Sequence, residues 1–172
     1  KLIERKTAFI SQLNDIIFFF FSNLSGGIEN IKLVYDPDVQ IIDYKKYLNN
    51  AREKDIRYKT TSVGPHRDDL IFMIQDIDIR KFGSQGQQRT AALSLKLSEI
   101  ELVKILTGDS PVLLLDDVLS ELDSNRQNYL LNSIGEIQTI ISCTGLDEFI
   151  SNRFQINKVF KVTEGKVEIV GR

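Results

Sequence analysis

The run from Pro111 to Asp123, Pro-Val-Leu-Leu-Leu-Asp-Asp-Val-Leu-Ser-Glu-Leu-Asp, constrains the fold and chemistry of this chain more than any other segment. Its apolar start predicts a short buried strand, because parallel strands covered on both faces read as continuous hydrophobic runs. The strand ends abruptly in Asp116 and Asp117. Two adjacent carboxylates are a poor end for a buried strand, but they suit a Mg²⁺ ion held beside a phosphate. The run therefore predicts a metal-assisted phosphate site at a strand end.

A second pattern lies upstream, where Gly83-Ser84-Gln85-Gly86-Gln87-Gln88-Arg89 precedes a helical run. Small residues and a serine at a helix start leave backbone N–H groups and a hydroxyl free for a ligand, so this junction predicts an anion site. The helix itself is predicted from apolar residues that recur largely at helical spacing between Thr90 and Leu106. These residues are Ala92, Leu93, Leu95, Leu97, Ile100, Val103 and Leu106.

The order of these elements is similar to the signature motif, Walker B motif and D-loop of ABC-type ATPases, with Ser120-Glu121-Leu122-Asp123 in the D-loop position. In those ATPases the signature helix of one subunit touches the γ-phosphate of ATP bound by the other, so the resemblance implies a shared site. The resemblance can be narrowed further, because three segments resemble the RecF branch of bacterial DNA replication and repair ATPases, which are related to SMC proteins. They are residues 64–70, 84–90 and 113–123.

The resemblance implies roles for individual residues. Asp116 would hold Mg²⁺, commonly through a water, and Asp117 would polarise the attacking water where many ABC-type ATPases have Glu. Because Asp is one methylene shorter, slow hydrolysis is expected. The alternative for either aspartate alone, and for Asp123, is a helix N-cap. The residues expected to contact the nucleotide are Ser84, Gln85, Gly86, Gln87, Asp123 and Thr144.

Two departures from the ABC pattern bear on what this chain does alone. The sequence contains no Gly-x-x-x-x-Gly-Lys-Ser/Thr loop, the backbone cradle for ATP phosphates. A RecF-like protein carries that loop near its beginning, so we expect the carboxy-terminal part of a longer protein, inactive by itself, whose whole form is a slow DNA-dependent ATPase. The second departure is Cys143-Thr144-Gly145, where ABC transporters usually place a switch histidine. The single histidine, His66, lies in another motif, which is expected to form a tight turn in which Arg67 pairs with Asp68 or Asp69. The alternative for His66 and Arg67 is a role at the nucleotide or DNA face.

The predicted fold class is α/β: part of a P-loop NTPase of the ABC type with a mostly parallel sheet, plus a mainly helical arm segment. Residues 1–60 are expected to form the arm and residues 61–172 the carboxy-terminal part of the ATPase domain. Patterning predicts helices at 2–24, 40–53, 90–106 and 124–134, a hairpin of 70–74 with 77–82, and strands at 31–35, 137–142, 157–162 and 166–170. The first helix has aromatics on nearly every face at Phe18 to Phe21, which predicts burial on two sides or by a missing partner.

Charge is uneven along the chain. The net charge of −2 gives no overall drive toward nucleic acid, but residues 45–67 hold seven basic residues against two acidic ones. Two interpretations stay open, a solvated helix and loop or a contact patch for DNA phosphates. The candidate DNA-binding residues are Lys45, Lys46, Arg52, Lys54, Arg57 and Lys59.

Composition fits a cytoplasmic protein. Cys143 is the only cysteine, so no disulfide can form within the chain, and at a strand end it is expected to be small and buried. The longest apolar run, Ile16 to Phe21, is far short of the roughly 20 residues needed to span a bilayer, so no membrane partner is expected.

The leading hypothesis is a RecF-like protein acting in DNA replication, recombination, repair and the SOS response. With ATP and Mg²⁺ as cofactors, it would close as a homodimer on DNA gaps or junctions and release them on hydrolysis, with recombination mediator proteins as partners. One alternative is the nucleotide-binding domain of an ABC transporter, for which a switch His and a Glu in place of Asp117 would be expected. The other is a metal-dependent hydrolase using Asp68, Asp69, Asp116 and Asp117, in which the signature loop would have no role.

Overall fold

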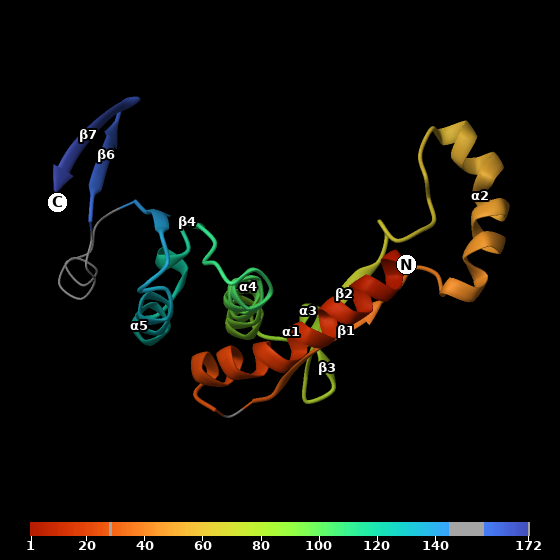
Figure 1. The fold of residues 1–172 in the computed structure, drawn as a ribbon, viewed down its shortest axis with the longest axis horizontal. Helices are drawn as coiled ribbons and strands as arrows, with labels where there is room; N and C mark the ends of the chain where they lie inside the picture. Colours follow the sequence, from red (N-terminus) through yellow and green to blue (C-terminus); the bar gives the residue numbers. More distant parts are fainter. Residues whose placement is uncertain (28, 145–156, 172) are drawn as a thin grey trace. The chain divides into compact units, whose positions relative to one another are not determined.

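The protein is represented by a computed structural model that describes residues 1–27, 29–144 and 157–171 (Figure 1). Its chain forms two compact units, Lys1–Ser110 and Pro111–Arg172. Within the described ranges, no helix combines the length and apolar character needed to cross a membrane.

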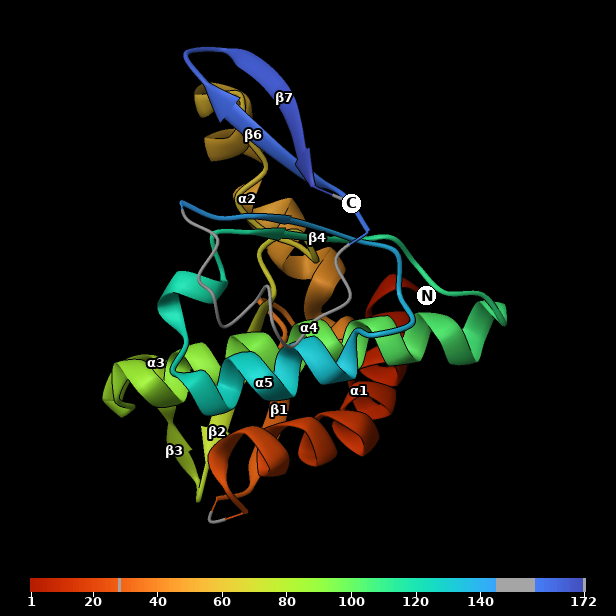
Figure 2. The ribbon, with the colours of Figure 1, turned by 90° about the vertical axis from the view of Figure 1, so that its left-hand side faces the viewer.

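The first unit is built on a three-stranded antiparallel sheet with the order β1-β2-β3. The helix α1 (Leu2–Ser25) packs against both β1 (Ile31–Asp36) and the long helix α4 (Gln85–Thr107) (Figure 2). The strands β2 (Asp69–Ile74) and β3 (Ile77–Asp78) complete the sheet. The core between these elements consists of Leu13, Ile17, Phe21, Ile31, Leu33, Ile74, Ile79, Ala91 and Leu102.

The aromatic run in α1 is buried on one side only, which corrects the expectation of burial on two sides. Phe21 is fully buried, whereas Phe18 and Phe19 are 48% and 61% exposed. Phe21 lies four residues after Ile17 and eight after Leu13, so these three side chains share the face that packs on the sheet. Burial by a partner outside this chain, the other alternative, stays a prediction.

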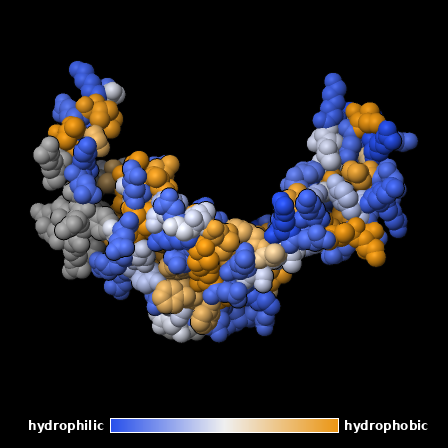
Figure 3. Space-filling view, viewed as in Figure 1, coloured by the Kyte–Doolittle hydropathy of each residue, from blue (hydrophilic) through white to orange (hydrophobic). Residues whose placement is uncertain are grey.

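The segment between β1 and β2 carries the short 3₁₀ helix η1 (Ile41–Asp43) and the helix α2 (Tyr44–Tyr58). The helix runs five residues past its predicted end and ends where Lys59 adopts a left-handed φ of 52°. No residue of α2 is buried. Isoleucines of both elements are exposed, Ile42 of η1 at 91% and Ile56 of α2 at 67%, and Figure 3 shows apolar side chains among polar ones over this segment.

Two boundaries in the middle of the chain differ from prediction. The second hairpin strand stops at Asp78, and residues Ile79–Phe82 form the single helical turn α3, because the Asp78 side chain accepts a hydrogen bond from the backbone N–H of Arg80. The helix α4 begins at Gln85 rather than Thr90. Ser84 and Gln87 cap its start reciprocally, so the signature residues belong to the first helical turn.

The second unit contains one parallel and one antiparallel strand pair. Strands β4 (Leu113–Asp116) and β5 (Thr139–Ser142) are parallel, and β6 (Val159–Thr163) pairs antiparallel with β7 (Lys166–Gly171). Between β4 and β5 lie η2 (Leu119–Glu121) and the helix α5 (Ser124–Ser133). The α/β class is confirmed, although among the described strands only β4 and β5 run parallel.

The strand β4 is not buried on both faces as its apolar sequence predicts. Leu113 and Leu115 are buried, but Leu114 is 70% exposed, and Ile140 on the neighbouring strand is 60% exposed. Alternation of this kind marks a sheet with one covered and one open face among the described residues.

Candidate nucleotide site

The end of β4 brings both predicted Walker B aspartates beside Ser142. The parallel register pairs Asp116 with Ser142 at the carboxyl ends of the two strands. The Ser142 hydroxyl donates a hydrogen bond to Oδ1 of Asp116. The backbone N–H of Asp117 donates in turn to the Ser142 carbonyl oxygen at 3.1 Å and lies 3.3 Å from its hydroxyl oxygen.

Asp117 has a left-handed backbone, with φ of 51°. Asp and Asn are the residue types, apart from Gly, that adopt this conformation most readily, so the backbone gives a physical reason for Asp rather than Glu at this position. Its carbonyl oxygen accepts a hydrogen bond of 2.8 Å from the Ser120 hydroxyl. The backbone of Asp117 is thus held from both sides while its side chain is exposed.

The residues at this strand end fit a Mg²⁺ ion bound together with a nucleotide. Mg²⁺ usually keeps several waters and takes one or two carboxylates plus the substrate phosphates. Asp116 is exposed and forms no ion pair with the described residues, so its charge is available. The described residues include no group of three or more acidic, His or Cys side chains that could hold a metal ion.

The D-loop candidate Asp123 is engaged as a helix cap. Its Oδ1 accepts hydrogen bonds of 3.1 Å from the backbone N–H groups of Asn125 and Arg126, and the Arg126 guanidinium lies 2.8 Å from Oδ2. These hydrogen bonds lower the pKa of the Asp123 carboxyl, although desolvation acts in the opposite direction. The hydrogen bond from the backbone N–H of Arg126 has the largest effect. The N-cap alternative is therefore confirmed, and a further contact with a nucleotide stays a prediction.

The two residues that follow β5 are exposed. Thr144 and Cys143 are both exposed. The expectation of a buried cysteine is wrong, because the strand ends before residue 143 and the described residues cover only one face of the strand pair. Exposure leaves the Thr144 hydroxyl accessible to a phosphate.

The signature residues form a capped helix start in the first unit. The Ser84 hydroxyl oxygen accepts from the backbone N–H of Gln87 at 3.2 Å, and Gln87 Oε1 accepts from the Ser84 N–H at 2.9 Å. The amide nitrogen of Gln87 donates to Glu29 at 2.7 Å, so both polar groups of Gln87 are engaged within the chain. No described residue accepts the Ser84 hydroxyl proton, and the N–H groups of Gln85 and Gly86 lie at the exposed helix start, where α-helices leave donors unpaired.

Two further residues shape this start and were not singled out from the sequence. A Cβ on Gly83 would lie 2.5 Å from the Ile79 carbonyl oxygen, so only glycine fits between α3 and α4. The amide nitrogen of Gln88 donates to that same carbonyl oxygen at 2.9 Å. The sequence did not predict the close approach of Gly83 to Ile79, because it depends on the helical turn α3. The alternating apolar pattern of residues 77–82 had predicted a strand there. A Cβ on Gly86, by contrast, would lie 3.8 Å from the Ser84 hydroxyl oxygen, which is an ordinary van der Waals contact.

The motif Gly64-Pro65-His66-Arg67-Asp68-Asp69 is a tight turn held by a buried carboxylate. The Asp68 side chain is 3% exposed and accepts hydrogen bonds from Lys6 Nζ at 2.9 Å, from the Tyr35 hydroxyl and from the backbone N–H of Asp38 at 3.1 Å. Burial alone would raise the pKa of this carboxyl, but the donors outweigh it and lower the pKa. The pKa of the Tyr35 hydroxyl is raised, mainly by burial and secondly by its hydrogen bond to Asp68 and the negative charge of that carboxylate.

Asp69 is exposed and pairs with a different cation. Arg80 donates to both of its carboxylate oxygens, at 2.6 and 3.0 Å, and to the Leu70 carbonyl at 2.8 Å. The Arg80 hydrogen bonds lower the pKa of Asp69 to about 2. The expectation that Arg67 pairs with Asp68 or Asp69 is therefore wrong, because each carboxylate is already held by a cation from a distant element. The predicted tight turn is confirmed by the hydrogen bond from the Arg67 N–H to the Gly64 carbonyl, 2.8 Å.

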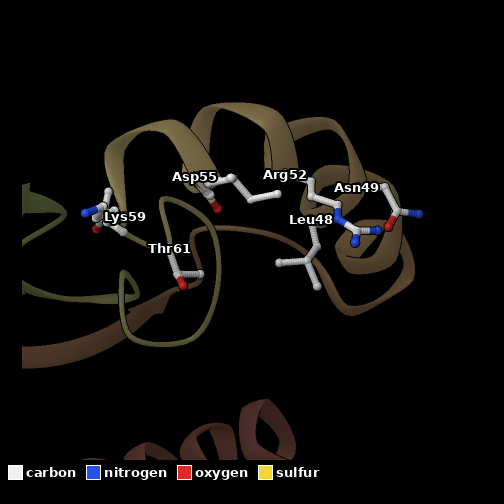
Figure 4. A pocket seen from close by; sticks show the side chains of 8 residues that line it. Leu48, Asn49, Arg52, Asp55, Lys59 and Thr61 are labelled. Carbon is white, nitrogen blue, oxygen red and sulfur yellow. The ribbon is translucent and has the colours of Figure 1, made fainter.

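The six candidate DNA-contact residues do not share one face of α2. Lys45 and Arg52 are seven residues apart and lie on one side of a helix, whereas Lys46 and Arg57, eleven apart, lie on another. An open groove of about 590 Å³ runs between α2 and the loop that follows it, and Arg52 and Lys59 are its two cations (Figure 4). The other lining residues are Leu48, Asn49, Asp55, Ile56, Thr60 and Thr61.

Comparisons with known proteins agree with this geometry. No family model matches the chain. It is 66% identical over 166 residues to the DNA replication and repair protein RecF of Lachnospira eligens, covering 96% of this chain and 46% of that protein. The RecF of Agathobacter rectalis is 57% identical over 169 residues, covering 98% and 47%. The chain therefore spans about half the length of the curated relatives that it matches.

Two solved structures of the recombination mediator protein RecF in the RecFOR pathway resemble this one. The RecF-ATPrS structure has a TM-score of 0.74 at 33% identity, and the RecF-ATP structure a TM-score of 0.73 at 34% identity. Each match covers 98% of this chain and 46% of the other.

The helix start at Ser84 and the parallel strand end at Asp116, together with these structures, define the class: the fold is part of a P-loop NTPase of the ABC-ATPase type. Within that class the chain belongs to the RecF family.

Proposed function

We propose that this chain forms the signature and Walker B part of a RecF protein that binds ATP and Mg²⁺, dimerises on DNA gaps or junctions and hydrolyses ATP slowly in recombinational repair and replication. The observation that carries the proposal is the strand end, where Asp116 is exposed and no described residue forms an ion pair with it, in a chain that is 33–34% identical to RecF structures described with ATP or ATPrS. In the whole protein, the phosphate loop would come from the part that this chain does not span.

The residues of this chain would act in three ways. Asp116 would hold the metal, and Asp117, with its backbone fixed by Ser142 and Ser120, would orient the attacking water. The Ser84 hydroxyl and the exposed helix start would contact the γ-phosphate of the nucleotide on a second subunit. Bound Mg²⁺ would supply charge stabilisation for the transferred phosphoryl group.

A chimera tests this proposal, with this chain replacing the matching segment of Lachnospira eligens RecF. We expect Mg²⁺-dependent ATP hydrolysis by the chimera with DNA, and none by the chain alone. Asp116→Asn and Ser84→Arg should each abolish hydrolysis. Ser84→Arg should do so by preventing ATP-dependent dimerisation, which ultracentrifugation with ATP measures. Asp76→Asn, at an exposed turn with φ of 65°, and Ser110→Arg are the matched controls. Hydrolysis by the chain alone, or by the Asp116→Asn chimera, would contradict the proposal and favour the hydrolase.

The DNA contact is proposed for the groove side of α2. Arg52 and Lys59 lie in one groove and would neutralise two backbone phosphates, whereas Lys46 and Arg57 lie on another side. Substituting both groove cations with Gln should reduce the slope of log affinity against log salt by about 2. The Lys46→Gln, Arg57→Gln pair should leave that slope unchanged. Equal effects of the two pairs in a fluorescence-anisotropy salt titration would instead show a diffuse electrostatic contribution.

A further inference from the structure

Ser142 occupies a position that no motif assigns. It lies on β5, 26 residues after Asp116, and the strand register alone brings the two together. Its hydroxyl donates to Asp116 and lies within hydrogen-bond distance of the Asp117 N–H, while its carbonyl oxygen accepts from that same N–H. A single side chain therefore contacts both Walker B aspartates.

The hydrogen-bond pattern fixes the orientation of the Asp116 carboxylate. A serine hydroxyl has one proton, and here that proton goes to Oδ1 of Asp116 while the Asp117 N–H approaches its oxygen. A carboxylate at a strand end otherwise rotates freely, since the carboxyl torsion of Asp is broad. With Oδ1 engaged, Oδ2 has no hydrogen-bond or ion-pair partner among the described residues.

The chemical type of the donor matters as much as its place. A hydroxyl is neutral and leaves the negative charge of Asp116 intact, whereas a Lys or Arg in that position would compensate the charge and compete with a cation. Groups that hydrogen-bond a metal ligand set its orientation, and their loss typically weakens metal binding or activity 10-fold to 100-fold.

We propose that Ser142 is a positioning residue that orients Asp116 for Mg²⁺ and holds the backbone of Asp117 beside it. This inference rests on the proposed function, because it presumes that Asp116 holds the metal. Ser142 would contact neither the nucleotide nor the attacking water, and it would act only through the two aspartates.

The test measures Mn²⁺ binding to the chimera in the presence of ATP by electron paramagnetic resonance, together with the Mg²⁺ concentration that half-saturates hydrolysis. Ser142→Ala should weaken Mn²⁺ binding about 10-fold and raise the half-saturating Mg²⁺ concentration by a similar factor. Ser142→Thr, which keeps the hydroxyl and suits a strand, should restore both values to within about 3-fold. Ser133→Ala, which removes a hydroxyl bonded to the Tyr129 carbonyl in α5, is the matched control and should change neither.

The outcomes separate the two proposals. Unchanged Mn²⁺ binding in Ser142→Ala, or failure of Ser142→Thr to restore it, overturns the role of Ser142 while the proposed function stands, provided that Asp116→Asn abolishes binding. Equal weakening in Ser133→Ala shows general destabilisation and likewise overturns it. An unmodified chimera that binds no Mn²⁺ with ATP overturns both.

Discussion

The two Asp-Asp pairs of this chain, Asp68-Asp69 and Asp116-Asp117, look alike in sequence and differ in what surrounds them. In the first pair each carboxylate is held by a cation, Asp68 by Lys6 and Asp69 by Arg80. In the second pair the Ser142 hydroxyl, a neutral donor, holds the Asp116 carboxylate, and no described residue donates to the Asp117 carboxylate.

This difference separates a structural pair from one available to a cation. A carboxylate already paired with Lys or Arg contributes to the fold and offers little net charge to a metal, whereas a carboxylate held by neutral donors keeps its charge. The comparison therefore argues against a hydrolase that uses all four aspartates as metal ligands. It leaves Asp116 and Asp117 for nucleotide chemistry.

The largest effect is expected from making the second pair resemble the first. Ser142→Lys would place an ammonium group beside Asp116 and compensate its charge. Loss of the metal contribution to charge stabilisation, several kcal/mol, should lower Mg²⁺-dependent hydrolysis by the chimera at least about 100-fold. Thermal unfolding should be little changed, since both residues are exposed. The control is Ser110→Lys, and an active Ser142→Lys chimera would break the comparison.

The second largest effect is expected on the free energy of unfolding when Asp68, the buried member of the first pair, loses its charge. Asp68→Asn should lower the free energy of unfolding by about 2 kcal/mol, because it weakens charge-assisted hydrogen bonds to Tyr35 and Lys6 in a buried site. The loss should be below that of a fully buried ion pair, since Lys6 is 34% exposed and can regain water. Urea unfolding of the chimera measures it, with Asp76→Asn as control. A loss under about 0.5 kcal/mol would mean that the network is not stabilising.

The pH dependence of that loss follows from the sign of the pKa shift. The pKa of Asp68 is lower in the folded protein than its ordinary value of 3.8, so the unfolded chain binds the proton more tightly and acid favours unfolding. The contribution of Asp68 is complete well above pH 3.8 and is lost as the pH falls through the folded pKa. The gap in unfolding free energy between the unmodified and Asp68→Asn chimeras should therefore narrow from pH 7 to about pH 3. If the gap widened in acid, the predicted direction of the Asp68 pKa shift on folding would be wrong.

The smallest effect is expected at Asp69. Its pair with Arg80 is exposed on both sides, and exposed ion pairs contribute little to stability. Asp69→Asn should change unfolding much less than Asp68→Asn at pH 7, and the difference should shrink further in high salt, which screens exposed pairs. Equal losses of unfolding free energy for the two substitutions would show that burial does not explain the difference between Asp68 and Asp69.

Prediction from the sequence succeeded where a pattern is local or long. The 3.6-residue periodicity predicted α1 to within one residue at its end, and Asp123 was foreseen as a cap of α5. It failed at Ile79–Phe82, where a capped turn replaced the expected strand, and in α4, where the buried face includes Thr90, Ser94 and Ser98. These hydroxyls each donate to the carbonyl four residues earlier, so polar residues could be buried in the helix without a partner elsewhere.

What the sequence by itself determined is the family, the α/β class and the cap of α5 at Asp123, because the partners of a cap lie within three residues of it. What only the tertiary structure decided is which aspartates are compensated. The partner of Asp68 lies 62 residues away and that of Asp116 lies 26 residues away, so no spacing rule connects them. The charge available at a carboxylate depends on the donors that folding brings to it, and two identical dipeptides can therefore serve different purposes.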